Sequence, residues 1–252
     1  MKRYFRGLLP DPLDRRDYPI AAFLPEAVAI PAEYRSEYES PVREQGTLGS
    51  CVAQASVAGM KEQQERRQVA SLASQNVAAP DPPPLSPLFV YQLCKKIDGI
   101  PKVDGTYVRV AMKVLQDTGV CPEDCLPYRP KLGQEPCPAW KELAEPYKIK
   151  SYASCPADVE AIKAAILEYG GVVAGVYTSY QWSRSTDGLI ADLKRNNQRM
   201  GGHAIWVCGW TADRFRFKNS WGVKWGDKGY GYLTYQYLED QMISGWTSVD
   251  VI

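Results

Sequence analysis

Histidine is almost absent from this sequence, because the 252-residue chain contains only one, His203. A metal site built from several histidines is therefore excluded, and any imidazole chemistry must come from this residue. The charges also lack a bias of either sign, since 30 Lys and Arg residues oppose 29 Asp and Glu residues without a long run of one kind. This balance does not indicate a nucleic-acid or membrane partner, and we expect neither.

Long apolar runs are missing as well. No stretch reaches the roughly 18 apolar residues of a membrane span, and residues 1–16 are charged, without an apolar core of secretory length. We therefore expect either a cytoplasmic protein, which is the favoured interpretation, or one whose leader has been removed. Hydrophobic residues make up 45% and charged residues 23%, which predicts an ordered globular chain, expected here as a monomer.

The seven cysteines are an odd number, so at least one thiol stays free. Three of them lie close together, at Cys121, Cys125 and Cys137. Their spacing matches no common zinc pattern, which favours loop cysteines, free or disulfide-bonded, over a metal site. We predict neither a metal nor a cofactor.

Helical periods dominate the first half of the chain and strand-like segments the second half. One helix is expected to begin at Ser50, and three others are expected at about 86–99, 106–118 and 157–169. Residues 70–84 are expected to form a linker or surface loop. The expected strands are 172–178, 204–210, 214–218 and 230–235. Residues 1–29, rich in proline, tyrosine and charge, are expected to form an extended arm. This segregation predicts an α+β protein with a cleft between two lobes.

Cys51 lies in the first turn of the helix predicted from Ser50. The helix dipole and the free N–H groups there favour thiolate over thiol, and the thiolate is the nucleophile. The preceding Gly49 lets a substrate carbonyl approach the backbone closely. Taken alone, a buried structural cysteine explains Cys51 at least as well.

Three other side chains have the chemistry to act with a thiol. His203 follows two glycines and begins an apolar strand, so it could face a cleft. Asn219, beside Trp221, could accept the second ring N–H of the histidine and fix its tautomer. Gln45 could donate to an oxyanion that develops next to Cys51. A surface histidine, a turn asparagine and a loop glutamine are the ordinary alternatives, but their joint occurrence favours catalysis.

The joint pattern resembles the papain family of cysteine peptidases. Gln45-Gly46-Thr47-Leu48-Gly49-Ser50-Cys51 is similar to the family's Q-x5-C nucleophile segment, and Gly202-His203-Ala204 resembles its histidine segment. The most specific match is Asn219-Ser220-Trp221-Gly222, which continues through Trp225-Gly226 to Gly229-Tyr230. The resemblance covers about residues 30–252.

This resemblance implies a papain-like two-lobe fold. The helical lobe is expected at about 45–130 and an antiparallel, barrel-like sheet lobe at about 140–252, with the active site in the cleft between them. The implied roles are Cys51 as nucleophile, His203 as general base and acid, Asn219 as orienting group and Gln45 in the oxyanion hole. The implied substrate-binding residues are Gly105, Thr106, Tyr107, Val108, Gly175, Ala204 and Trp221.

The implied activity is hydrolysis of a peptide or protein substrate through a thioester acyl-enzyme. The arm, residues 1–29, is then a candidate short prosegment of a zymogen, which either covers the cleft or packs on the back of a lobe. The chain departs from the family at Leu48, where a disulfide cysteine is usual, and at Val52, where an aromatic residue is usual. An acyltransferase and an inactive binding protein of the same fold remain the alternative functions.

Overall fold

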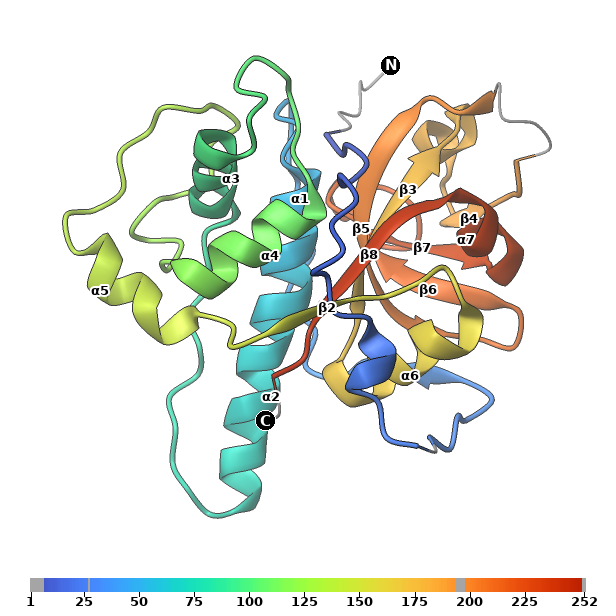
Figure 1. The fold of residues 1–252 in the computed structure, drawn as a ribbon, viewed down its shortest axis with the longest axis horizontal. Coiled ribbons are helices and arrows are strands. Elements are labelled where there is room, and N and C mark those ends of the chain that lie inside the picture. Colours follow the sequence, from blue (N-terminus) through green and yellow to red (C-terminus); the bar gives the residue numbers. More distant parts are fainter. Residues whose placement is uncertain (1–6, 27, 194–197, 251–252) are drawn as a thin grey trace.

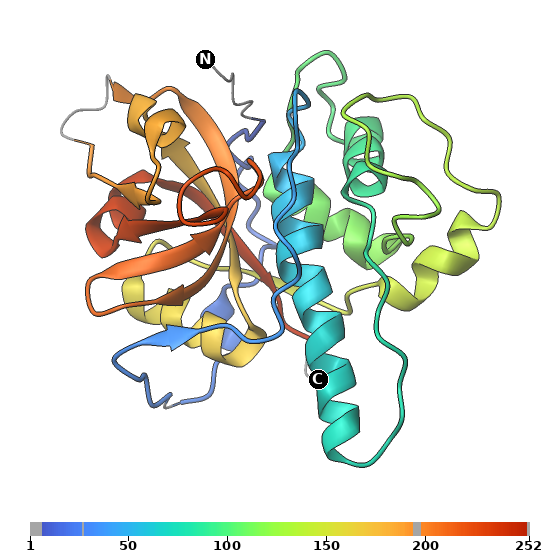
Figure 2. The ribbon, with the colours of Figure 1, turned by 180° about the vertical axis from the view of Figure 1, so that it is seen from behind.

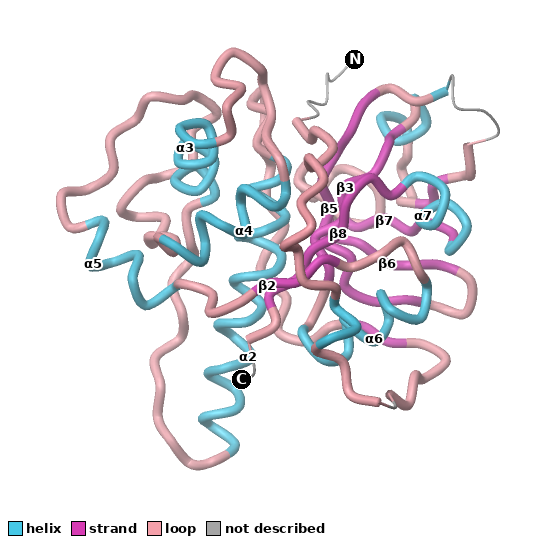
Figure 3. The backbone as a smooth tube through the Cα atoms, viewed as in Figure 1, coloured by secondary structure: helices cyan, strands magenta, loops and turns pink. Residues whose placement is uncertain are grey.

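Most helices gather on one side of the molecule, and the strands, with α6 and α7, lie on the other, as Figure 3 shows for this computed structural model. The structure describes residues 7–26, 28–193 and 198–250. In these residues no helix is long and apolar enough to cross a bilayer. Two separate apolar cores, one under the helices and one under the sheet, give the two lobes predicted from the sequence.

A long rod of helix begins at the candidate nucleophile and lies at the junction of the lobes (Figure 2). It runs through α1 (Cys51–Ala53), a wider π-helical segment η2 (Gln54–Lys61) and α2 (Glu62–Ser74). A small residue is required where this rod meets the sheet, because a Cβ on Gly59 would lie 2.5 Å from the Cβ of Trp206. The rod continues to Ser74, so the linker expected from residue 70 begins later.

The other helices of this lobe are close to their predicted positions. They are α3 (Pro87–Ile97), α4 (Val108–Asp117), the unpredicted α5 (Trp140–Ala144) and the short η3 (Glu145–Tyr147). The Ser86 hydroxyl accepts a hydrogen bond from the Phe89 N–H, as expected of an N-cap. Trp140 packs against Phe89, and Ile149 lies in the same core. The expected start of the sheet lobe at about 140 is therefore wrong, because this segment belongs to the helical lobe.

The second lobe is one sheet with the strand order β2-β8-β3-β5-β6-β7-β4, and β1 also pairs with β5. The strands are β1 (Tyr34–Arg35), β2 (Tyr152–Ser154), β3 (Val172–Thr178), β4 (Leu189–Ile190), β5 (Gly201–Trp210), β6 (Arg214–Lys218), β7 (Tyr230–Thr234) and β8 (Met242–Ser248). All pairs are antiparallel except β4 with β7, which differs from the fully antiparallel lobe expected. The helices α6 (Val159–Tyr169), α7 (Tyr235–Gln241) and η4 (Tyr180–Arg184) complete the lobe.

The N-terminal arm runs down between the two lobes (Figure 1). It is not wholly extended, because Ile20–Ala22 form a short 3-10 turn, η1, whose Ile20 is buried in the core of the sheet lobe. Asp11 fixes the middle of the arm, since its carboxylate accepts hydrogen bonds from the Trp246 indole N–H (2.8 Å) and the Arg109 backbone N–H (3.1 Å). Tyr4 and Phe5, two further residues by which the sequence could anchor the arm, lie outside the described residues.

Candidate active site

Cys51 is fully buried at the N-terminus of α1, against the start of β5. Burial raises the pKa of its thiol to about 11, while hydrogen bonds from the backbones of Ala204, Gly7 and Val52 oppose the shift. The sequence predicted a thiolate favoured by the helix start. In this form of the molecule that expectation is wrong, because the desolvation of the buried sulfur outweighs the helix-start donors. The bond from Ala204 places the sulfur beside His203, its neighbour in β5.

His203 and Asn219 form the hydrogen bond that the sequence predicted. The distance from His203 Nε2 to Asn219 Oδ1 is 2.8 Å, and both side chains are buried. The same Oδ1 accepts the Ser220 backbone N–H at 2.8 Å. Since an N–H can donate only to the oxygen of the amide, this second bond fixes which way Asn219 points. Nε2 of His203 must therefore carry the ring proton.

A cluster of aromatic side chains covers this pair. The ring of Trp221, a residue predicted to bind substrate, is buried, and its centroid lies 4.5 Å from that of the His203 ring. Trp182, on η4, meets the His203 ring edge-on at 6.1 Å and also contacts Trp221 and Trp225. Sequence reasoning missed Trp182, because no motif surrounds it. These rings cover the histidine from two separate segments, η4 and the loop after β6.

Gln45 lies in the turn that leads to the nucleophile and is held at several points. Its amide nitrogen donates to the Leu48 carbonyl at 2.9 Å, and its amide oxygen accepts from the Ser220 hydroxyl at 2.6 Å. Because the amide oxygen of Gln45 binds Ser220, its NH₂ group points toward Leu48, just before the start of α1. The side chain of Ser50, where the helix was predicted to begin, does not cap the helix; its hydroxyl shares a hydrogen bond of 2.6 Å with the Tyr128 hydroxyl.

The arm lies directly on Cys51, the candidate nucleophile, and on Thr106, one of the residues predicted to bind substrate. Thr106 N–H donates to the Gly7 carbonyl (2.9 Å), Leu9 N–H to the Thr106 carbonyl (3.1 Å) and Leu8 N–H to the Gly202 carbonyl (3.3 Å). Only glycine fits at Gly7, because a Cβ there would lie 1.9 Å from the Gly49 carbonyl oxygen. The arm thus occupies the cleft as an added strand.

The predicted substrate-binding residues surround this part of the arm. A Cβ on Gly105 would lie 2.5 Å from the Gly7 carbonyl oxygen, and a Cβ on Gly175 would lie 2.5 Å from a methyl carbon of Leu8. Val108 and Ala204 belong to the same buried cluster as Leu8, while Tyr107 is half-buried as the N-cap of α4. Gly202 also lines this groove, although the sequence reasoning did not include it.

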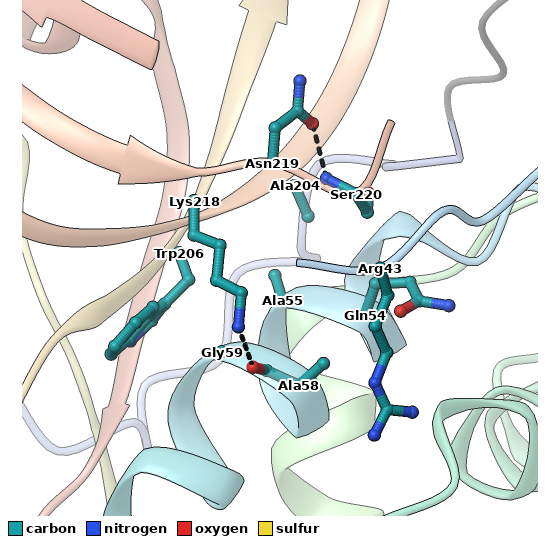
Figure 4. A pocket seen from close by; sticks show the side chains of 10 residues that line it. All are labelled: Arg43, Gln54, Ala55, Ala58, Gly59, Ala204, Trp206, Lys218, Asn219 and Ser220. Carbon is teal, nitrogen blue, oxygen red and sulfur yellow. Dashed lines mark hydrogen bonds between the residues drawn. The ribbon is translucent and has the colours of Figure 1, made fainter. Parts of the chain in front are cut away.

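Lys218 crosses from the sheet lobe to the helical lobe directly below Asn219. Figure 4 shows its side chain reaching the helix that begins at Cys51. Its ammonium donates to the Ala58 carbonyl (2.7 Å) and to the Ser40 carbonyl (2.6 Å) and hydroxyl (2.8 Å). Burial lowers the pKa of Lys218 to about 8. These bonds fix the distance between the two halves of the site.

Two of the three clustered cysteines form a disulfide, Cys125–Cys137. These two sulfurs are therefore not available as metal ligands in this form, and disulfide-bonded loop cysteines were among the alternatives that the sequence left open. Among the described residues, no group of three or more His, Cys, Asp or Glu side chains could hold a metal ion. The remaining cysteines, including Cys51, are free and buried.

Comparison with known proteins decides the family. The family model described as "Papain family cysteine protease" matches residues 28–244. The chain belongs to the papain family. The match begins two residues before residue 30, where the resemblance was expected to begin, and leaves most of the arm outside.

Its curated relatives include an uncharacterized peptidase C1-like protein of Acanthamoeba polyphaga mimivirus. This papain-family chain is 31% identical to it over 216 residues, which is 80% of this chain and 66% of the viral protein. Cathepsin K of Gallus gallus is 30% identical over 208 residues, or 79% of this chain and 56% of the cathepsin. The chain thus spans between half and two thirds of the length of these relatives.

Solved structures share the whole architecture. Xylellain, a cysteine protease from Xylella fastidiosa, superimposes with a TM-score of 0.83 at 27% identity and covers 97% of this chain and 96% of its own. Digestive procathepsin L 3 from Tenebrio molitor larval midgut has the same fold, with a TM-score of 0.71 at 21% identity. The papain-like two-lobe prediction is confirmed.

Asn219 and His203 should differ in the size of their effects. Asn219→Ala removes one hydrogen bond to a ring that becomes charged, so kcat/KM should fall by about 10- to 100-fold. His203→Ala removes the proton carrier, and the loss should be about 10³-fold or more. Steady-state kinetics of both variants on one peptide substrate measure this difference. Equal, small losses would contradict the two roles.

Proposed function

We propose that this chain hydrolyses peptide bonds by nucleophilic catalysis. Cys51 is the nucleophile, His203 the general base and acid, Asn219 the residue that orients the imidazole, and Gln45 a donor to the oxyanion. One observation carries this proposal. The Cys51 thiol, at the start of α1, accepts a hydrogen bond from the backbone of Ala204, and the neighbouring His203 is hydrogen-bonded through Nε2 to the Asn219 side-chain oxygen.

The proton transfers follow from the tautomer of His203. Since Nε2 donates to Asn219, Nδ1 is the nitrogen that takes the Cys51 proton. The thiolate attacks the substrate carbonyl carbon, and the oxyanion is bound by the Cys51 N–H and the Gln45 amide. His203 then returns the proton to the leaving amine. Water attacks the thioester, His203 takes its proton, and the acid product leaves with the thiol restored.

The groove occupied by the arm supports a peptide as the substrate. The arm is held by backbone–backbone hydrogen bonds to the N–H and carbonyl of Thr106 and to the carbonyl of Gly202. Such bonds can be made by a peptide of any sequence. Side-chain selection would come from the space beside Gly175 that Leu8 fills. We therefore expect substrates with an apolar side chain at that position.

The acceptor of the acyl group separates hydrolysis from acyl transfer. A peptide substrate is incubated with the full chain, with and without an added primary amine, and the products are identified by mass spectrometry. We expect the free acid to dominate in both cases, because water is the acceptor. Amide as the main product at millimolar amine would favour the acyltransferase, and absence of any cleavage by a Gly7→Ala chain, in which the added methyl group is expected to displace the arm from the cleft, would favour the inactive binding protein.

A further inference from the structure

Gly105 and Thr106 form a short extended segment, called the groove strand below, which pairs with the arm through a single β-bridge between Thr106 and Leu8. This segment is itself fixed by α3. Gly105, next to Thr106, has both of its backbone polar groups bound by side chains of this helix. Its N–H donates to the Tyr91 hydroxyl at 2.9 Å, and its carbonyl accepts from the Lys95 ammonium at 2.8 Å. Tyr91 and Lys95 are four residues apart and therefore share one face of α3. Both are buried.

The lysine organises the whole loop that leads into the groove strand. Besides Gly105, its ammonium donates to the carbonyls of Ile100 and Val103, each at 2.9 Å, and pairs with the Asp98 carboxylate at 2.8 Å. A charge with four acceptors around it is fully satisfied despite its burial. The Lys95 ammonium thus holds the loop from Asp98 to Gly105 in one conformation, and Thr106 cannot shift without breaking these hydrogen bonds.

Asp104 connects the groove strand to the turn before the nucleophile. Although the side chain is partly open to solvent, its Oδ1 accepts the Gly49 backbone N–H at 2.9 Å and the Tyr91 hydroxyl at 3.0 Å. Gly49 is buried and lies two residues before Cys51. A continuous chain of hydrogen bonds therefore runs from Gly105 through Tyr91 and Asp104 to Gly49.

We propose that Tyr91 and Asp104 are positioning residues of this peptidase, with separate effects on binding and on chemistry. Tyr91 holds the groove strand, which binds the substrate backbone. Asp104 holds the turn that presents the Cys51 N–H to the oxyanion. This inference rests on the proposed function, because it assigns these side chains to the substrate groove and the nucleophile turn of that same site.

Three variants of the full chain test the two roles. Tyr91→Phe loses the acceptor of the Gly105 N–H, and KM for a peptide should rise about 10-fold while kcat changes by less than about twofold. Asp104→Ala frees the Gly49 N–H, and kcat should fall about 10-fold. Asp104→Asn keeps an acceptor oxygen and should restore kcat to within about twofold of the parent.

The substitutions are made in the natural sequence and in the Gly7→Ala chain, because loosening the cleft floor can also release the arm. Asp117→Ala removes an exposed carboxylate of the same lobe and serves as the control, expected to leave kcat and KM unchanged. Thermal unfolding shows whether each variant folds. Equal kcat values for Asp104→Ala and Asp104→Asn, or a Tyr91→Phe chain that changes only in melting temperature, would overturn the inference. Hydrolysis that survives Cys51→Ala would instead overturn the proposed function itself.

Discussion

Gly7→Ala should raise kcat/KM for a peptide substrate by about tenfold or more, because overpacking of this kind costs about 1–3 kcal/mol. The added methyl would lie 1.9 Å from the Gly49 carbonyl oxygen, a backbone atom that cannot move away cheaply. The arm would then leave the cleft and expose Thr106 and Gly202. Deletion of residues 1–29 should raise the rate at least as much, although it also removes the buried Ile20.

The arm does not present a cleavable bond at Gly7. The backbone of Gly7 donates toward the Cys51 sulfur, and the Gly7 carbonyl is turned away to accept from Thr106. With this orientation of the Gly7 carbonyl, we expect the arm to block the cleft without being cleaved at Gly7. It also explains why the thiol is so deeply buried here.

Gly7→Ala should also increase the reactivity of the Cys51 thiol at neutral pH. In the covered form the pKa of Cys51 is raised to about 11, mainly by burial, so the thiol is neutral at pH 7. Displacement of the arm returns water to the sulfur and lowers this pKa, which increases the thiolate fraction at neutral pH. Alkylation of Cys51 by iodoacetamide at pH 7, followed by mass spectrometry, should therefore be faster in Gly7→Ala.

A matched change elsewhere in the arm controls for altered stability. Leu13 is fully exposed, so Leu13→Ala should leave both the peptidase rate and the alkylation rate unchanged. If Gly7→Ala or the deletion lowers the melting temperature but leaves kcat/KM and alkylation as they were, the arm is a purely structural element. That outcome would refute its role as a prosegment.

Cys51→Ala should abolish peptide hydrolysis, with a loss of kcat/KM of at least about 10⁴-fold, because no other group can form the acyl-enzyme. Labelling of position 51 by iodoacetamide should also disappear. The effect should appear in the Gly7→Ala chain as well, where the parent activity is expected to be higher. Circular dichroism should show an unchanged fold, since alanine fills a helix-start position without strain.

Cys155 provides the matched control, because it is also a free, buried thiol but lies in the sheet lobe, packed in the second core. Cys155→Ala should keep kcat/KM within about twofold of the parent, with any effect confined to stability. Hydrolysis that persists in Cys51→Ala would remove the basis of the whole proposal. Equal losses in both variants would indicate a folding defect instead of lost chemistry.

Local sequence was sufficient for the elements with clear capping signals. Ser86-Pro87 and Gly170 mark the start of α3 and the end of α6, and the strands β3 and β6 were predicted over their observed ranges. The strand β8 was missed because its apolar residues do not alternate and Gly245 interrupts them. Its pairing with both β2 and β3 is what makes it a strand. The π-helical segment after α1 also has no local signal.

The sequence by itself determined which chemical groups this protein can use. One histidine, one cysteine at a helix start and an Asn-Ser-Trp-Gly segment limit the chemistry to a thiol and an imidazole held by an amide. These identities follow from residue types and short spacings, which the sequence states directly. The tertiary structure decided everything that depends on contacts between distant segments. Burial by Gly7 and its surroundings keeps the Cys51 thiol neutral, and Lys218 and Asp104 fix the two lobes and the nucleophile turn, because desolvation and hydrogen bonding act through space and not along the chain.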